Sequence, residues 1–222
     1  MLFRSLSEKK VKIWEGNTSK EFLKSKNLDY AQGVMGPMYG YQWRNFNGKY
    51  MLDSNKKPIK QKTGIDQLKN VINLINNDPT SRRILMTSYN PEQAEDGVLY
   101  PCHSLIIQFS VEDDYLDMFC YNRSQDLFLG VPYNIASSSL LLTIIAIVTN
   151  KIPRYFHMTM GDAHIYNSHI DAVKQQLNES LIPYKFPTLE IDNFEDFELL
   201  EYKDFHLINY NCHGIIKANM VV

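Results

Sequence analysis

The sequence predicts an α/β (α+β) fold over residues 1–222, in which helices pack on a twisted sheet. Apolar residues recur at helical spacing in several segments, and runs rich in β-branched and aromatic residues lie between them. The chain has 222 residues, of which 44% are hydrophobic, enough for one domain to bury a core.

The first half of the chain predicts a loop-rich entry, one helix and a set of strands. Residues 14–63 are rich in Asn, Gly, Lys and aromatic residues without clear periodicity, which is typical of turns. A helix is predicted over 65–77, where Pro79 soon follows and prevents its continuation. Strands are predicted at 83–89, 104–111 and 115–121, the last two joined by a hairpin at 112–114.

The second half predicts two more helices around another strand. A hydrophobic helix is expected over 133–148, a strand over 153–161, and an amphipathic helix over 167–177 with a packed apolar face. The tail from Phe186 predicts short strands and loops. The apolar run Leu140–Val148 is too short, and too polar at its edge, for a membrane span, so we expect a buried helix.

Composition narrows the function classes. A formal net charge of −2 gives no reason to expect nucleic-acid binding. Three widely spaced cysteines, without a CxxC pair, indicate neither a disulfide framework nor a zinc site, so no metal is expected. The first ten residues lack a secretory signal, and a cytoplasmic location is therefore the expectation.

The chemistry of the chain is concentrated between residues 100 and 134. Cys102 stands at the entrance to a predicted strand, and Arg123 follows at the end of the next strand. A thiol acts as a nucleophile mainly in its thiolate form, which a nearby guanidinium favours. If the two strands are neighbours, this pair suits attack on an anionic, hydrogen-bonding ring.

These residues belong to motifs that resemble the thymidylate synthase family, in the family's order and over almost the whole chain. The matching segments are Val11–Trp14, Gly36–Arg44, Asp78–Arg83, Pro101–His103, Arg123–Asp126, Gly130–Ser137, Gly161–Tyr166 and Tyr210–Val222. Many spaced motifs in one order are far more specific than a lone short pattern.

The resemblance implies a methyltransferase that converts dUMP to dTMP, with 5,10-methylenetetrahydrofolate as cosubstrate and dihydrofolate as co-product. Cys102 is then the nucleophile that adds to C6 of the uracil. The family fold has a large twisted mixed sheet, and two subunits pack sheet to sheet in a homodimer. No membrane and no nucleic acid is required.

The same resemblance gives roles to further residues. For substrate binding it implies Arg123 and Ser124 at the phosphate, the pair Arg82 and Arg83 donated to the other subunit's site, Asn134 on the uracil edge, and His164 and Tyr166 at the ribose. For proton transfer it implies Tyr39 and His103, with Asp126 as a further catalytic group. For folate it implies Trp14, Asn17, Asp126, Gly130 and Val222.

Most of these residues also have plainer explanations. An isolated cysteine is more often inert packing, Asn134 also suits a helix N-cap, and Trp14 suits a core. Arg82 and Arg83 suit a solvated strand edge. Only the surrounding family motifs favour the catalytic interpretation.

The sequence departs from the family pattern at the front, where a phosphate-binding arginine and a glutamate of the proton network have no counterpart. We therefore expect a chain that lacks the family's N-terminal segment, or the C-terminal part of a dihydrofolate reductase-thymidylate synthase fusion. Two other functions stay open: a deoxyuridylate hydroxymethylase, and an inactive fragment or nucleotide-binding module. Smaller departures, Asn122 and Gln125, are expected to be tolerated.

Overall fold

The computed structural model describes residues 11, 13–178, 182–192 and 196–221. The chain divides into two compact units. The first is built from Met1–Gln125 and Asn134–Ala163, and the second from Asp126–Tyr133 and His164–Val221.

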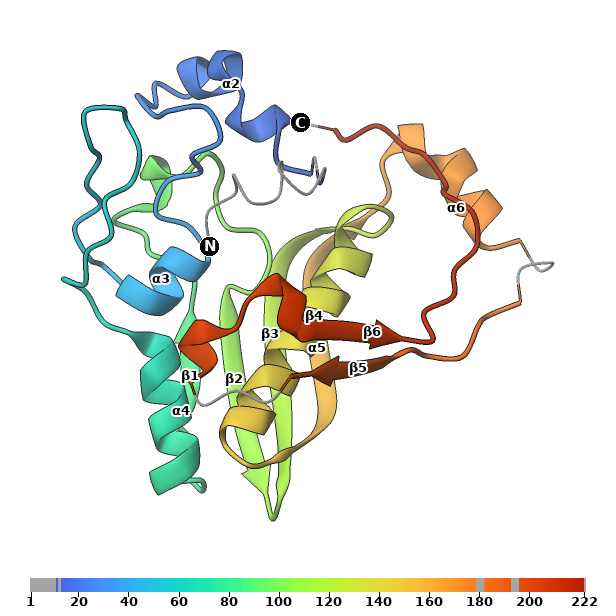
Figure 1. The fold of residues 1–222 in the computed structure, drawn as a ribbon. Helices are drawn as coiled ribbons and strands as arrows, with labels where there is room; N and C mark the ends of the chain where they lie inside the picture. Colours follow the sequence, from blue (N-terminus) through green and yellow to red (C-terminus); the bar gives the residue numbers. More distant parts are fainter. Residues whose placement is uncertain (1–10, 12, 179–181, 193–195, 222) are drawn as a thin grey trace. The chain divides into compact units, whose positions relative to one another are not determined.

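The first unit is organised on a four-stranded sheet in the order β1-β2-β3-β4 (Figure 1). Its strands are β1 Leu85–Thr87, β2 Ile106–Glu112, β3 Tyr115–Asp126 and β4 Ile152–His164. The pairs β1–β2 and β2–β3 are antiparallel, and Glu112 lies opposite Tyr115. Between them Asp113 has a φ of 54°, the left-handed backbone that tight hairpins use. The predicted hairpin at 112–114 is confirmed.

The fourth strand runs parallel to the third. The amide of Ile152 donates to the Asp114 carbonyl at 2.7 Å, and the amide of Tyr155 donates to the Asp117 carboxylate at 3.0 Å. Because the partners advance together along both strands, the sheet is mixed, as predicted. A parallel pair requires a crossover connection, and helix α5 (Gly130–Val148) supplies it.

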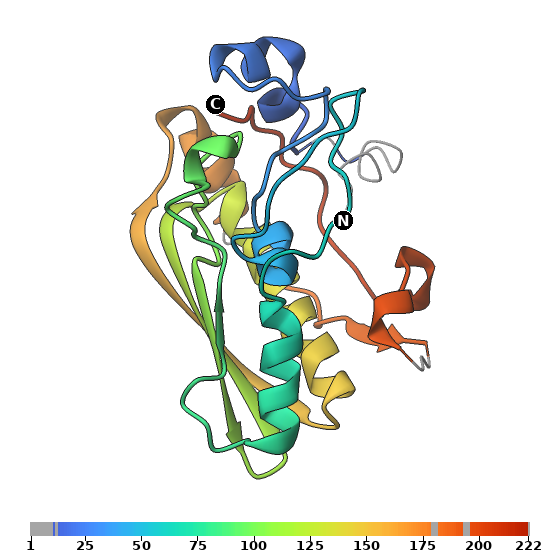
Figure 2. The ribbon, with the colours of Figure 1, turned by 90° about the vertical axis from the view of Figure 1, so that its left-hand side faces the viewer.

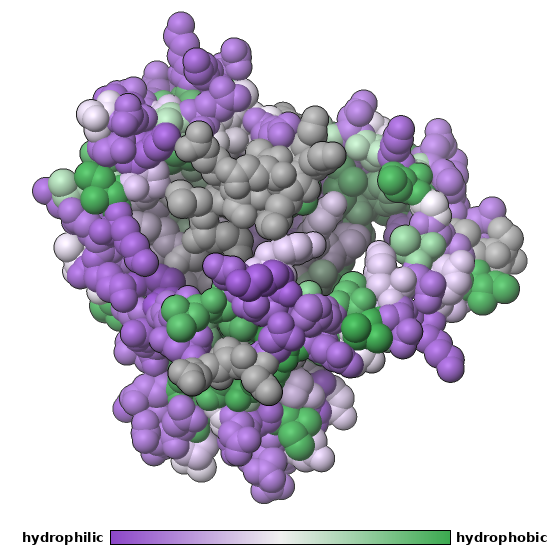
Figure 3. Space-filling view, in the orientation of Figure 1, coloured by the Kyte–Doolittle hydropathy of each residue, from purple (hydrophilic) through white to green (hydrophobic). Residues whose placement is uncertain are grey.

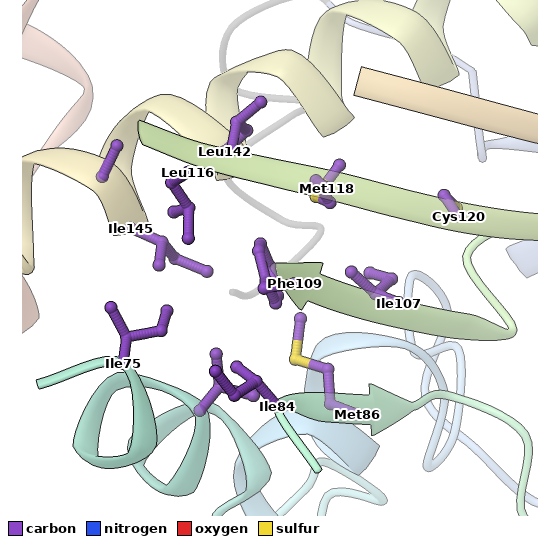
Figure 4. Packing of buried hydrophobic residues seen from close by; sticks show 12 residues of the cluster. Ile75, Ile84, Met86, Ile107, Phe109, Leu116, Met118, Cys120, Leu142 and Ile145 are labelled. Atoms are coloured by element: carbon purple, nitrogen blue, oxygen red, sulfur yellow. The ribbon is translucent and has the colours of Figure 1, made fainter. Parts of the chain in front are cut away.

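One face of the sheet is covered by α4 (Gln67–Asn77) and α5 (Figure 2). Asp66 caps α4 by accepting from the Lys69 amide at 3.1 Å, which confirms the predicted helix with a start two residues later. Figure 4 shows Phe109 of β2 in one cluster with Ile75 of α4 and Ile145 of α5. The other buried members of this core are Val71, Ile84, Met86, Ile107, Leu116, Met118, Cys120, Leu142 and Ala146.

Helix α5 is buried along one stripe only, which corrects the expectation of a buried helix. Asn134, Ser138, Leu142 and Ile145 follow one another at helical spacing on the buried side, while Ile147 is 45% exposed. With 19 residues α5 is apolar and long enough, by length and composition alone, to cross a bilayer. The helix begins at Gly130 and is therefore longer than the apolar run Leu140–Val148. Its Leu142 and Ile145 side chains pack on the sheet.

The opposite face of the sheet carries exposed apolar side chains. Ile106 lies opposite Tyr121, and the Phe119 ring stacks on His157 at a centroid distance of 4.6 Å. Exposures on this face range from 41% at Tyr121 to 57% at Tyr155. By contrast, in the view of Figure 3 hydrophilic residues predominate and apolar residues lie in small patches.

The loop-rich prediction for residues 14–63 is largely confirmed. Three short helical segments interrupt the loops: η1 (Gly16–Thr18), α2 (Lys20–Ser25) and α3 (Gly40–Asn45). A second small core forms here from Leu23, Met35, Met38 and Val98. The short helix η2 (Ala94–Asp96) lies farther along the chain.

The second unit contains short elements, as the tail prediction expected. They are η3 (Asn167–His169), α6 (Ile170–Gln176), β5 (Thr188–Ile191), η4 (Phe197–Leu199), η5 (Tyr202–Asp204) and β6 (Phe205–Ile208), with β5 and β6 antiparallel. The expected packed face of the 167–177 helix is wrong for the described chain. No α6 residue is buried, and Leu177 is 74% exposed, because the helix has only seven residues and ends before it.

Candidate active site

The Cys102 loop is held against the end of β3. It precedes β2, and the amide of Arg123 donates to the Cys102 carbonyl at 2.9 Å. The antiparallel pairing of β2 with β3 brings these residues together although 21 positions separate them in the sequence. The condition set from the sequence is therefore met: the strand that follows Cys102 and the strand that carries Arg123 are neighbours.

The Cys102 thiol faces the Tyr39 hydroxyl. Their Sγ and Oη atoms are 3.5 Å apart, and the Cys102 amide donates to the same Oη at 3.3 Å. Because the hydroxyl oxygen accepts from the amide, its own hydrogen is available to the sulfur. A hydrogen bond of this polarity stabilises a thiolate more than a thiol.

His103 completes a stack with Tyr39. The two rings are 4.3 Å apart with an interplanar angle of 13°, and His103 Nδ1 lies 3.3 Å from the Ser104 hydroxyl. Tyr39 has φ 41° and ψ −106°, a backbone conformation that is strained for a residue with a side chain. The ring is therefore placed from the position immediately before α3.

Burial sets the charge state of both rings. It raises the pKa of Tyr39 well above its ordinary value, and the adjacent Cys102 adds to the effect. Burial also lowers the pKa of His103 to about 4. At neutral pH the pair is thus a protonated phenol beside an uncharged imidazole, able to relay hydrogen bonds.

Arg123 spans the loop that carries the thiol. Its Nε donates to the Pro101 carbonyl at 2.9 Å and its Nη2 to the Tyr100 carbonyl at 3.1 Å. A cavity of about 280 Å³ opens here. Its lining is Lys26, Ala94, Glu95, Gly97, Val98, Leu99, Tyr100, Cys102 and Arg123. It joins the thiol to two cationic side chains.

Asn134 and Ser124 are linked through a residue that the sequence interpretation passed over. Gln125 is 2% exposed; it donates from Nε2 to the Ser124 carbonyl at 3.2 Å and accepts from Asn134 Nδ2 at 3.0 Å. The sequence analysis treated Gln125 only as a tolerated departure from the family pattern, and its hydrogen bonds become visible in the structure.

Asn122 is a second residue whose part was missed. Its Oδ1 accepts from the Ser104 amide at 2.6 Å and from the Cys120 thiol at 3.3 Å. Ser104 has a φ of 53°, so the bond holds an unfavourable backbone next to His103. Only the pairing of β2 with β3 reveals this contact.

The second unit contains four of the predicted site residues. Asp126 Oδ1 accepts from the amides of Phe128 and Leu129 at 2.9 and 3.2 Å, and His169 Nδ1 is 3.8 Å from the same oxygen. The rings of His164 and Tyr166 meet edge to face at 5.0 Å. Gly130 begins α5. Their predicted roles stay predictions.

The remaining predicted residues lie elsewhere. Trp14 packs on the second core, Asn17 is buried in η1, and Val222 falls outside the described residues. Arg82 and Arg83 are exposed and precede β1, at the end remote from Cys102. There the Phe109 amide bonds to the Ile84 carbonyl, whereas the other end of β1 bonds to Leu105.

In the described part of the chain, no group of three or more His, Cys, Asp or Glu side chains is arranged to hold a metal ion. The reactive groups brought together at this site are the Cys102 thiol, the Tyr39 phenol and the Arg123 guanidinium. The thiol lies on a loop at the edge of a mixed sheet and lines a cavity with two cationic side chains. Such a site is suited to covalent catalysis by a cysteine on anionic substrates.

Comparison with known proteins gives the family. The family model for thymidylate synthase matches residues 2–222. Thymidylate synthase 1/2 of Encephalitozoon cuniculi is 40% identical over 97% of this chain and 72% of its own length. The chain belongs to the thymidylate synthase family.

Other relatives are longer. The bifunctional dihydrofolate reductase-thymidylate synthase of Plasmodium chabaudi is 45% identical over 88% of this chain, and the match spans 33% of that protein. The thymidylate synthase of Human herpesvirus 8 type P is 46% identical, with 85% of this chain and 54% of the viral protein matched. The chain thus spans only part of several curated relatives.

Proposed function

We propose that this protein methylates dUMP to dTMP with Cys102 as the nucleophile. The observation that carries the proposal is the Cys102 thiol, 3.5 Å from the Tyr39 hydroxyl, in a cavity that it shares with Arg123. Within the thymidylate synthase family, this arrangement fits a thiolate that adds to an anionic pyrimidine nucleotide.

The nucleotide is oriented by charge and by its base edge. Arg123 uses two of its five N–H donors on loop carbonyls, and the others suit phosphate oxygens. Ser124 adds a hydroxyl beside it, and Asn134 accepts from uracil N3–H while donating to O4. His164 and Tyr166 hold the ribose 3′-hydroxyl.

The covalent step is reversible at Cys102. The sulfur bonds to C6 of the uracil and its electron pair moves through C5, which becomes the carbon nucleophile. After C5 has gained its methyl group and lost its proton, the C6–S bond breaks and the thiolate is regenerated. Tyr39 and His103, neutral at pH 7, relay protons at C5 and O4 rather than carry a positive charge.

The cosubstrate is 5,10-methylenetetrahydrofolate, which supplies one carbon and a hydride and leaves as dihydrofolate. Asp126 offers a carboxylate for pterin N–H groups, and its Oδ1 is already fixed by two backbone amides. The family resemblance assigns Trp14, Asn17, Gly130 and Val222 to folate binding as well. The Asp126 carboxylate accepts from such N–H groups, and the Trp14 indole suits the aromatic face of a pterin.

We further propose a homodimer that packs through the open face of the sheet. Exposed apolar patches of this kind mark interaction surfaces, and Ile106, Phe119 and Tyr155 are each more than 40% exposed there. Arg82 and Arg83 then serve the partner's phosphate site, since they lie at the far end of β1 from their own Cys102 loop. The three free thiols suit a cytoplasmic location.

Product analysis tests the reaction. The purified protein is incubated with dUMP and methylenetetrahydrofolate, and the nucleotides are identified by mass spectrometry. We expect dTMP, and a covalent adduct on Cys102 when 5-fluoro-dUMP replaces dUMP; Cys102→Ala removes both. Hydroxymethyl-dUMP as the main product indicates the hydroxymethylase instead. A thermal shift with dUMP but no adduct indicates a nucleotide-binding module.

Subunit mixing tests the dimer. We expect Cys102→Ala and the double variant Arg82→Ala, Arg83→Ala each to be inactive, and their mixture to regain part of the activity. One site of the mixed dimer then keeps both an intact thiol and intact partner arginines. A monomer by light scattering, with no recovery on mixing, contradicts this part of the proposal.

A further inference from the structure

The amide of Asn134 is held in one orientation by a short hydrogen-bond chain. Asn134 Nδ2 donates to Gln125 Oε1 at 3.0 Å, and Gln125 Nε2 donates to the Ser124 carbonyl at 3.2 Å. Gln125 is 2% exposed and Asn134 is 9% exposed, so water competes little for these groups.

This hydrogen-bond chain has a fixed direction because it ends on a backbone carbonyl. A carbonyl oxygen only accepts, so the NH₂ group of Gln125 must face Ser124 and its oxygen must face Asn134. Asn134 therefore presents its own NH₂ group to Gln125. Rotating either amide by half a turn would leave two oxygens or two NH₂ groups facing each other, a buried mismatch.

The anchor of this chain is itself tied to the nucleophile loop. The Ser124 amide lies 3.4 Å from the Cys102 carbonyl, next to the 2.9 Å bond from the Arg123 amide to the same oxygen. The orientation of the Asn134 amide is thus fixed relative to the backbone that carries the Cys102 thiol.

We propose that Gln125 is a positioning residue that makes the site select uracil over cytosine, an inference that rests on the proposed function. Uracil offers a donor at N3 and an acceptor at O4, whereas cytosine offers the reverse. With one Nδ2 hydrogen on Gln125, Asn134 keeps its oxygen for N3–H and its second hydrogen for O4. An amide free to rotate serves cytosine equally well.

The test compares the binding of dUMP and dCMP by calorimetry, without folate. Gln125→Met keeps the size of the side chain but removes its polarity. Gln125→Glu, studied at a pH where its carboxyl is protonated, still presents an oxygen to Asn134 and donates its hydroxyl to the Ser124 carbonyl. We expect the preference for dUMP to fall about tenfold in Gln125→Met, the scale of one hydrogen bond, and to persist in Gln125→Glu.

Two further variants separate positioning from stability. Gln67→Met is the matched control, because Gln67 also uses both ends of its amide on backbone groups, those of Thr87 and Gln42, which are not part of the Asn134 hydrogen-bond chain. We expect it to lower the thermal midpoint and leave the nucleotide preference unchanged. If Gln125→Met does not fold, Gln125→Ala replaces it with the same expected loss of preference.

The outcomes distinguish the inference from the proposed function. A wild-type protein that prefers dUMP, together with a Gln125→Met variant of unchanged preference, overturns the role of Gln125 alone. A wild-type protein that binds neither nucleotide overturns the proposed function, and the inference with it. A parallel loss in Gln67→Met shows a general packing effect and also overturns the inference.

Discussion

Acid is expected to destabilise this protein through His103. Its pKa is about 4 in the folded protein because the ring is buried, compared with 6.5 ordinarily. Between these two values the unfolded chain binds a proton that the folded protein does not. The free energy of unfolding therefore keeps its full value above about pH 6.5 and falls as the pH drops toward 4.

The size of the effect follows from the shift. At about 1.4 kcal/mol for each pH unit, the depressed pKa corresponds to a loss of about 3 kcal/mol by pH 4. This is a substantial share of the 5–15 kcal/mol that typically stabilises a domain. The shift is expected to show as a lower urea midpoint with an unchanged m value.

The assay is urea denaturation at about pH 7 and about pH 4, for the wild-type protein and for His103→Gln. Glutamine can hydrogen-bond Ser104 but does not titrate, so the variant should lose about 3 kcal/mol less than the wild type between the two conditions. His213→Gln removes an exposed histidine and serves as the control. Equal losses in wild type and His103→Gln, or an NMR titration of His103 near pH 6.5, would refute the reasoning.

Three further changes test the structure. Gly36→Ala should destabilise the protein by more than about 2 kcal/mol in urea melts, because φ is +83° and a Cβ would meet the Asp96 carbonyl oxygen at 2.2 Å. In the control Gly33→Ala, the added Cβ meets nothing within 4 Å, so this variant should cost about 1 kcal/mol. Arg154→Leu should lower the urea midpoint and return the lowered pKa of Asp117 toward its usual range, measured by NMR titration; the stability from this carboxylate is present above its usual pKa and disappears as the pH falls. Tyr39→Phe should slow adduct formation with 5-fluoro-dUMP by about 10²–10³-fold, with little change in dUMP affinity.

Signals in the neighbouring sequence, such as apolar spacing, a helix cap or a proline, predicted the elements that depend mainly on nearby residues. Helix α4 is specified by apolar spacing, by the Asp66 cap and by the proline after its end. The predicted start of α5 at residue 133 was three residues late. Pro132 lies in its first turn, where proline is tolerated because these amides lack intrahelical partners anyway. Periodicity also predicted a packed face on α6, but it cannot show whether another element covers that face.

The candidate site was predictable only where a motif carried it. Cys102, Arg123 and Asn134 were found from the sequence, and strand pairing brings the first two together. The parts played by Gln125 and Asn122 could not be found this way. Each acts through hydrogen bonds whose partners depend on the register of β2 against β3 or on the start of α5, and glutamine and asparagine have no pattern that announces such bonds.

The same register explains how the thiol's surroundings can be rigid although they lie in loops. Tyr39, which contacts Cys102 and His103, and Ser104, which follows them in the sequence, both have positive φ, which costs each about 1–3 kcal/mol. The Ser104 amide is held by Asn122 of β3 and its carbonyl accepts from Ser88, each at 2.6 Å. These hydrogen bonds to the sheet therefore offset the strain and fix the segment that carries the Cys102 thiol and the His103 imidazole.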